Sequence, residues 1–118
     1  MDNPYISYLS AGQSQINSTP RTLIVAEEKT IIPVSLFVTS TVEESLFLDV
    51  VVTLQRAAPA PFFLAKHLPL APYERTELIR GAPLYLAPGD SIELNTDFSS
   101  TYCDALICYS KLNETINL

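Results

Sequence analysis

The chain is poor in the residues that most often carry catalysis or bind metals. Its 118 residues include one histidine, two cysteines and no tryptophan. Acid–base and nucleophilic catalysis need a histidine or another activated partner within reach, and His67, between Lys66 and Leu68 in a proline-rich stretch, has none in its motif. Zinc needs about four nitrogen or sulfur ligands at workable spacing. We therefore expect a protein that is not an enzyme and that binds no cofactor and no metal.

Positive charge is also scarce. Seven Lys and Arg stand against 13 Asp and Glu, which gives a net charge of −6. Binding to the phosphates of nucleic acids needs clustered basic side chains, and these seven are scattered. No stretch approaches the roughly 20 apolar residues of a membrane-spanning helix, and the first residues do not resemble a secretory signal. We expect a soluble protein with no nucleic-acid or membrane partner.

Glycine is rare, with three residues, whereas nine prolines separate the apolar stretches. This composition is typical of short strands joined by stiff loops. Pro88-Gly89 fits the central positions of a type II turn, because proline fixes the first φ and glycine accepts the positive second one. Cys103 and Cys108 lie five positions apart in one expected strand, on opposite faces and roughly 16 Å apart, so we expect no disulfide between them.

What the chain does contain is a repeated alternation of apolar and polar residues. A period of two places alternate side chains on opposite faces of a strand, so each such segment can bury one face. We predict eight strands, at 21–26, 31–39, 46–55, 62–66, 74–79, 84–87, 91–97 and 103–112. Short strands with frequent turn signals predict an all-β fold, an antiparallel two-sheet β-sandwich or jelly roll, with a small barrel as the alternative.

The first 19 residues differ from the rest in composition. They are rich in polar residues, and among them stand the apolar residues Tyr5, Ile6, Tyr8 and Leu9. We expect residues 1–19 to form an extended N-terminal arm and residues 20–118 to form the β-sandwich domain. Two interpretations of the arm stay open, a frayed terminus and a segment that becomes ordered on a neighbouring surface.

Several carboxylates lie close together in the second half of the chain, namely Asp90, Glu93, Asp97 and Asp104. Paired carboxylates can cleave glycosidic bonds, and a sandwich could bring them together. However, strand positions that alternate with apolar residues explain them as solvent-facing side chains. Asp49, a charged residue inside a long apolar strand, must face solvent, a polar contact or a subunit interface, and of these we expect solvent.

The order of the segments resembles that of small β-sandwich structural proteins of bacteriophage particles. The first half carries Thr22–Ala26, Ile31–Ser40 and Leu46–Gln55, which look like an apolar strand, a polar link and two long paired strands. The second half carries Gly81–Leu94 and Asp104–Ser110, similar to a Pro-Gly-Asp-Ser turn between apolar strands. The resemblance spans roughly residues 20–112 and carries no functional residues across, and the proline-rich segment 57–72 departs from it.

The resemblance implies a virion structural protein that assembles in many copies and acts by binding. The first hypothesis is a capsid decoration or cement protein that bridges capsid subunits, and the next is a neck, tail or baseplate component. The expected partners are the major capsid protein or other virion subunits, together with further copies of the chain in a homo-oligomer. The residues expected to make the contact are Tyr5, Ile6, Tyr8, Leu9, Phe62, Phe63 and His67. A ligand-binding sandwich, such as a carbohydrate-binding module, is the alternative from another class.

Overall fold

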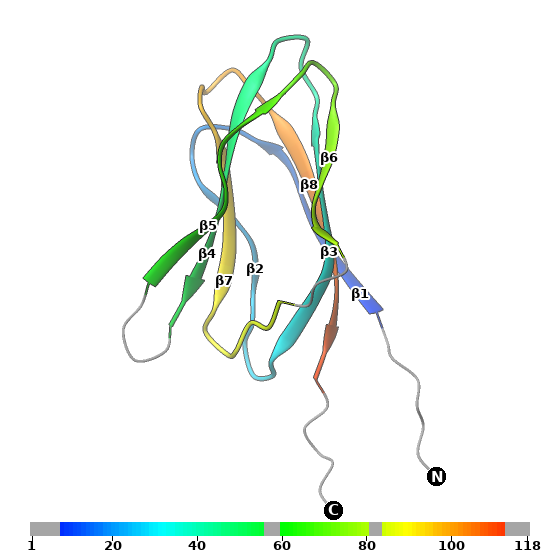
Figure 1. Cartoon of the computed structure of the whole chain (residues 1–118), viewed down its shortest axis with the longest axis vertical. Coiled ribbons are helices and arrows are strands. Elements are labelled where there is room, and N and C mark those ends of the chain that lie inside the picture. Colours follow the sequence, from blue (N-terminus) through cyan, green and yellow to red (C-terminus); the bar gives the residue numbers. More distant parts are fainter. Residues whose placement is uncertain (1–7, 56–59, 81–83, 113–118) are drawn as a thin grey trace, which may run out of the picture.

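The protein is an eight-stranded antiparallel β-sandwich, as a computed structural model of the chain shows (Figure 1). The structure describes residues 8–55, 60–80 and 84–112. The all-β prediction is therefore confirmed. The strands are β1 (Tyr8–Ile16), β2 (Arg21–Val25), β3 (Ile31–Ser40), β4 (Leu46–Leu54), β5 (Ala60–Leu70), β6 (Arg75–Arg80), β7 (Ser91–Thr96) and β8 (Cys103–Lys111).

The strand order identifies which sandwich this is. Sheet A has the order β1-β8-β3-β6, and sheet B has the order β2-β7-β4-β5. Consequently β1 pairs with β8, β2 with β7, β3 with β6 and β4 with β5. This is the pairing of one long hairpin rolled over itself, which is the jelly roll. Of the architectures that the sequence left open, the structure selects this one.

The core lies between the two sheets and follows the predicted parity. In β4 the inward residues Leu46, Leu48, Val50 and Val52 are buried, and those between them are exposed or half-buried. The same alternation holds along β7. A sandwich that buries one face of each sheet produces this pattern, because successive side chains point to opposite faces of a strand.

Two expected elements differ from the prediction. The segment 84–87 is no strand, because only Leu86 pairs, through reciprocal 2.9 Å hydrogen bonds with Ile31, before the turn begins. Residues 8–16, expected in an extended arm, instead form the edge strand β1 of the sandwich. Most of its residues are exposed, so the strand lacks the apolar alternation by which the others were found. Tyr5 and Ile6 lie outside the described residues.

Strand β5 is longer than the predicted 62–66. It extends from Ala60 to Leu70 and includes Pro61 and Pro69. Because β5 is the edge of sheet B, a residue without an N–H can lie on its unpaired side. His67, which lies beyond the predicted strand in the proline-rich stretch, is therefore part of β5.

The predicted turn at Pro88-Gly89 is confirmed. The Asp90 N–H donates to the Ala87 carbonyl over 2.9 Å, and Gly89 has a φ of +98°. Asp90 itself is buried, however, and does not face solvent as expected. Its carboxylate accepts hydrogen bonds from the backbone N–H groups of Gln55 and Ala87, over 2.7 and 2.9 Å. The charge is buried because the backbone supplies donors for it.

All four edge strands carry irregular pairing. An extra residue interrupts the ladder of β1 between Gln13 and Ile16, that of β2 at Leu23 and that of β6 at Leu78. In β5 the ladder is interrupted twice, between its pairings with Leu48 and Val50 and between those with Val50 and Val51. These are β-bulges, which bend a strand and increase its twist.

Among the described residues no helix is long and apolar enough to cross a membrane.

Candidate interaction surface

The outer face of sheet B presents a row of side chains across three strands. Val51 lies between the buried Val50 and Val52, so its side chain points away from the core. Its cross-strand partners are Phe63 on β5 and Glu93 on β7. Residues directly opposite in a ladder share a face, so all three lie on the outer face.

Two further contacts place cationic or titratable groups on this face. The Lys66 ammonium lies over the ring of Phe63, 4.4 Å from its centroid. The rings of Phe47 and His67 are stacked, with centroids 4.0 Å apart and planes inclined by 4°. Phe47 points outward because its neighbours Leu46 and Leu48 are buried. The aromatic rings of this face are thus each in contact with a basic side chain.

A bulge in β5 holds His67 in this position. Two residues of β5, Lys66 and His67, lie opposite the single residue Asp49 of β4. His67 has a φ of +56°, in the left-handed region, and its N–H donates to Asp49 Oδ1 over 2.7 Å. Asp49 is half-buried and accepts a backbone hydrogen bond, rather than simply facing solvent as expected. The carboxylate stabilises a backbone conformation that non-glycine residues seldom adopt.

These residues form one continuous region, which we call the sheet B surface. Its charges are arranged by strand, with the positive group on β5 and the negative groups on β4 and β7. Its members are Phe47, Asp49, Val51, Phe63, Lys66, His67 and Glu93.

Phe62 lies on the other face of β5. It pairs with the buried Val52, yet it is 54% exposed, compared with 50% for Phe63. The exposure follows from its place at the edge of the sandwich, where the ends of β4 and β5 nearest to the 56–59 segment stand away from sheet A (Figure 1). Leu64 is exposed beside it. We call Phe62, Phe63 and Leu64 the β5 edge. It presents large apolar side chains on both faces of the strand.

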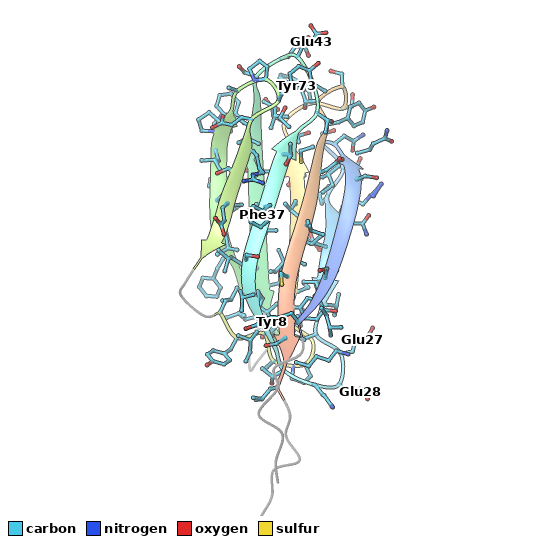
Figure 2. All side chains as sticks on the ribbon, turned by 90° about the vertical axis from the view of Figure 1, so that its right-hand side faces the viewer. Tyr8, Glu27, Glu28, Phe37, Glu43 and Tyr73 are labelled. Atoms are coloured by element: carbon cyan, nitrogen blue, oxygen red, sulfur yellow. The ribbon has the colours of Figure 1, made fainter. Side chains whose placement is uncertain are left out.

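Tyr8 and Leu9 form a second exposed apolar patch, which we call the β1 surface. They are 59% and 40% exposed at the start of β1, and Tyr8 lies near the end of sheet A in Figure 2. In the two sheets β1 packs beside β2, whereas β5 lies beside β6. The β1 surface and the β5 edge consequently lie on opposite edges of the sandwich.

The acidic residues considered for catalysis are used mainly to bind backbone. Asp97 Oδ1 accepts from the Phe47 N–H over 3.2 Å, and Asp104 Oδ1 accepts from the Gln15 N–H over 2.9 Å. Within the described part of the chain no three His, Cys, Asp or Glu side chains lie together as a metal site would require. Three of the four carboxylates, those of Asp90, Asp97 and Asp104, thus accept hydrogen bonds from backbone N–H groups.

The two cysteines are free thiols, in agreement with the expectation. Cys103 is fully buried in the core, and Cys108 is half-buried. Burial, with a smaller contribution from the negative charge of Asp104, raises the pKa of Cys103 to about 12. A thiol of that pKa is protonated at neutral pH and is not a nucleophile.

A hollow lies at the end of the molecule near the link between β2 and β3. It has a volume of about 430 Å³, and its lining includes Glu27, Glu28, Lys29, Tyr109 and Lys111. Glu27 and Glu28 are at the lower end in Figure 2, and Glu43 is at the opposite end. The hollow is open and its charges are of both signs, so it favours no single class of ligand.

Comparison with known proteins gives a likeness of structure but none of sequence family. No family model matches the chain, and no curated protein matches it. A chain in the structure of infectious bursal disease virus, Gx strain, is similar with a TM-score of 0.49 and 14% sequence identity. The match covers 94% of this chain and 31% of that chain.

Sequence reasoning found part of the sheet B surface and missed part. It selected Phe63 and His67, which the structure brings to one face. It missed Phe47, Lys66 and the contact of His67 with Asp49. Phe47 alternates with the apolar residues Leu46 and Leu48, and this alternation could have predicted that Phe47 points outward. The bulge that places His67 over Phe47 could not be predicted, because it depends on the pairing of β5 with β4.

Proposed function

We propose that this protein is a non-enzymatic structural component of a virus particle, and more specifically a capsid decoration or cement protein that bridges capsid subunits. One observation carries the proposal. Two apolar exposures, the β1 surface and the β5 edge, lie on opposite edges of one rigid sandwich. A protein that links two neighbours needs two separate binding surfaces, and a compact sandwich fixes the distance between them.

The composition of the two exposures supports binding to protein. Tyr8, Phe62 and Phe63 are each at least half exposed. Aromatic residues are enriched in protein–protein interfaces, where they contribute a large share of the binding energy. Tyr73, Tyr85 and Phe98 are exposed to a similar degree, but as single rings. Tyr8, Phe62 and Phe63 differ from them because each lies beside another exposed apolar side chain, Leu9 or Leu64.

The virion assignment depends on the fold and on the sequence resemblance together. Jelly rolls are found in viral capsids and also in lectins, so the fold by itself is an analogy. The resemblance of residues 20–112 to phage virion proteins favours the first of these. The proposal places the protein on a bacteriophage particle, with the major capsid protein or another virion subunit as its partner. A neck, tail or baseplate component would use the same surfaces.

A carbohydrate-binding module is the second candidate, because the sheet B surface combines aromatic and polar side chains. The contacts there argue against it. Lys66 lies over Phe63 and His67 lies over Phe47, so a sugar that stacks on these ring faces must first displace a side chain. Because side chains already cover these ring faces, we prefer protein binding to sugar binding.

Co-sedimentation with purified capsids tests the proposal. The capsids are taken from the virus that encodes the chain and are stripped of this protein. Deleting residues 1–19 would remove β1 and with it part of the fold, so point variants are used. We expect the double variants Tyr8→Ser with Leu9→Ser, and Phe62→Ser with Phe63→Ser, each to weaken binding at least about tenfold.

The control is Tyr73→Ser, since Tyr73 is equally exposed but lies at the far end of the molecule (Figure 2). This variant should sediment with capsids as the unchanged protein does. Undiminished binding by both double variants would contradict the proposal. Failure to bind capsids, together with binding to a glycan array that Phe63→Ser abolishes, would favour the carbohydrate-binding alternative.

A further inference from the structure

We propose that one end of the sandwich binds lysine or arginine side chains of a partner protein, through the exposed ring of Tyr73 and the carboxylates beside it. The links 41–45 and 71–74, which join β3 to β4 and β5 to β6, lie at this end. Neither the β1 surface nor the β5 edge belongs to it. Binding here is therefore separate from capsid binding and does not depend on it.

Tyr73 occupies a position at which the backbone favours glycine. The turns at residues 71–74 and 87–90 are built alike, with alanine first and proline second. In each turn the fourth N–H donates to the first carbonyl, over 3.0 and 2.9 Å. In each, the fourth carboxylate accepts from the first N–H, over 2.7 and 2.9 Å. The third residue has a positive φ in both, +98° at Gly89 and +59° at Tyr73.

The contacts of Tyr73 within the fold do not explain why a tyrosine stands there. The residue is 61% exposed, and among the described residues its side chain makes no hydrogen bond and no ring contact. A positive φ strains a bulky residue, and strained residues of this kind cluster at sites that bind ligands. The turn at 87–90 shows that the chain uses glycine in the same setting. The exposed ring itself is therefore the reason for a tyrosine.

Two carboxylates lie in the link next to this ring. The Ser40 N–H donates to the Glu74 carbonyl over 2.8 Å, which places the start of the β3–β4 link beside the turn of Tyr73. Glu43 and Glu44 are exposed in that link. Figure 2 shows Glu43 and Tyr73 at the same end of the molecule. A group that rests on the Tyr73 ring is consequently in a negative environment.

The charge of this end selects a cationic partner. Two other rings already hold a basic side chain of the chain itself: Lys66 lies over Phe63, and the guanidinium of Arg75 lies over Phe37 at 5.0 Å from its centroid. Tyr73 has no such neighbour among the described residues, and the two links contain no Lys, Arg or His. An aromatic face attracts a cation, and carboxylates beside it attract the same cation. The complementary group is a lysine or arginine of another protein.

Fluorescence anisotropy with a labelled hexa-arginine peptide at low ionic strength tests the proposal with the full chain. We expect the peptide to bind. Tyr73→Ser should weaken binding at least about threefold, because the cation loses its aromatic face. Tyr73→Phe, which keeps the ring, should bind as the unchanged chain does. Glu43→Gln combined with Glu44→Gln should also weaken binding at least about threefold.

Matched controls lie elsewhere on the molecule. Tyr85→Ser removes a tyrosine ring that is 53% exposed. Glu27→Gln combined with Glu28→Gln makes the same change of net charge at the opposite end (Figure 2). Neither control should weaken binding. Equal losses in the controls would overturn the proposal, because net charge alone would then attract the peptide. Failure to bind the peptide, or binding that Tyr73→Ser leaves unchanged, would overturn it as well, and so would glycan binding in place of peptide binding.

Tyr73→Gly separates binding from folding. It should weaken peptide binding as Tyr73→Ser does, yet melt no lower than the unchanged chain in thermal unfolding, because glycine relieves the backbone strain. A clearly lower melting temperature would show that the ring serves the fold, and would overturn the proposal. Capsid sedimentation of Tyr73→Ser should stay unchanged, so this proposal and capsid binding can fail separately.

Discussion

At the scale of single residues, Asp90 shows how a buried charge can hold two segments together. Its two carboxylate oxygens accept hydrogen bonds from Gln55, the residue after β4, and from Ala87, at the start of the tight turn. The carboxylate therefore fixes the turn against the end of a neighbouring strand. The sequence predicted the turn from Pro88-Gly89, but it placed Asp90 in solvent because burial of a charge depends on donors that only the fold brings near.

Replacing this carboxylate should be costly. Asp90→Ala leaves the N–H groups of Gln55 and Ala87 without their acceptor, and hydrogen bonds to a charged group each contribute about 1.5 to 3 kcal/mol. We expect a loss of about 3 kcal/mol in the free energy of unfolding, measured by urea denaturation. Asp104→Ala, which removes an exposed acceptor for Gln15, should cost less than about 1 kcal/mol. Equal losses for the two variants would show that the burial of Asp90 has no energetic importance.

At the scale of elements, β5 differs from the predicted strand in its length and in its regularity. The predicted strand 62–66 stopped short of the prolines at 61 and 69, yet both prolines are compatible with an edge strand. The alternation that identified β4 and β7 is broken in β5 by its bulges, which shift the parity of the residues beyond them. Parity within a regular strand can be predicted from one sequence. The position of a bulge cannot, because it is a property of the paired strand as well.

The bulge at His67 gives a test of this element. Its φ of +56° costs little for glycine but strains a residue with a Cβ atom. Both His67→Ala and His67→Gly lose the stack on Phe47, so their difference isolates the backbone. We expect the glycine variant to be more stable than the alanine variant by about 0.5 to 1 kcal/mol in chemical denaturation. Glycine relieves the backbone strain of the folded state, and its greater conformational entropy in the unfolded chain offsets part of that gain. The opposite order would show that the left-handed conformation of residue 67 is not maintained.

At the scale of the whole molecule, the two ends of the chain meet in one sheet. Tyr8 of β1 is paired with Ser110 of β8, and Ile16 at the other end of β1 is buried in the core. The core residues of β4 and β7 were predictable from periodicity. In β3 a shift of register between Pro33 and Ser35 breaks the alternation, so Ile31 is buried there and Ile32 is not. The pairing of the first strand with the last was not predictable, because β1 is mostly polar and its partner is about 100 residues away in the sequence.

Deleting β1 should therefore affect the entire sandwich. A chain that begins at residue 17 lacks Ile16 and leaves β8, otherwise a central strand, with an unpaired edge. We expect such a chain to lose cooperative thermal unfolding in calorimetry or to melt far below the intact protein. A chain that begins at residue 8 keeps β1 and is the matched control, with a melting temperature close to that of the intact protein. If the two shortened chains melted alike, β1 would contribute nothing to the fold.

The bulges on all four edge strands reduce the tendency of the protein to aggregate through its sheet edges. An unprotected edge offers a row of free N–H and C=O groups onto which a strand of another molecule can add, and repeated addition produces fibres. In this protein the row is interrupted on β1, β2, β5 and β6. At high local concentration, for example during synthesis, copies of the chain can therefore come into contact without adding strands to one another's sheets.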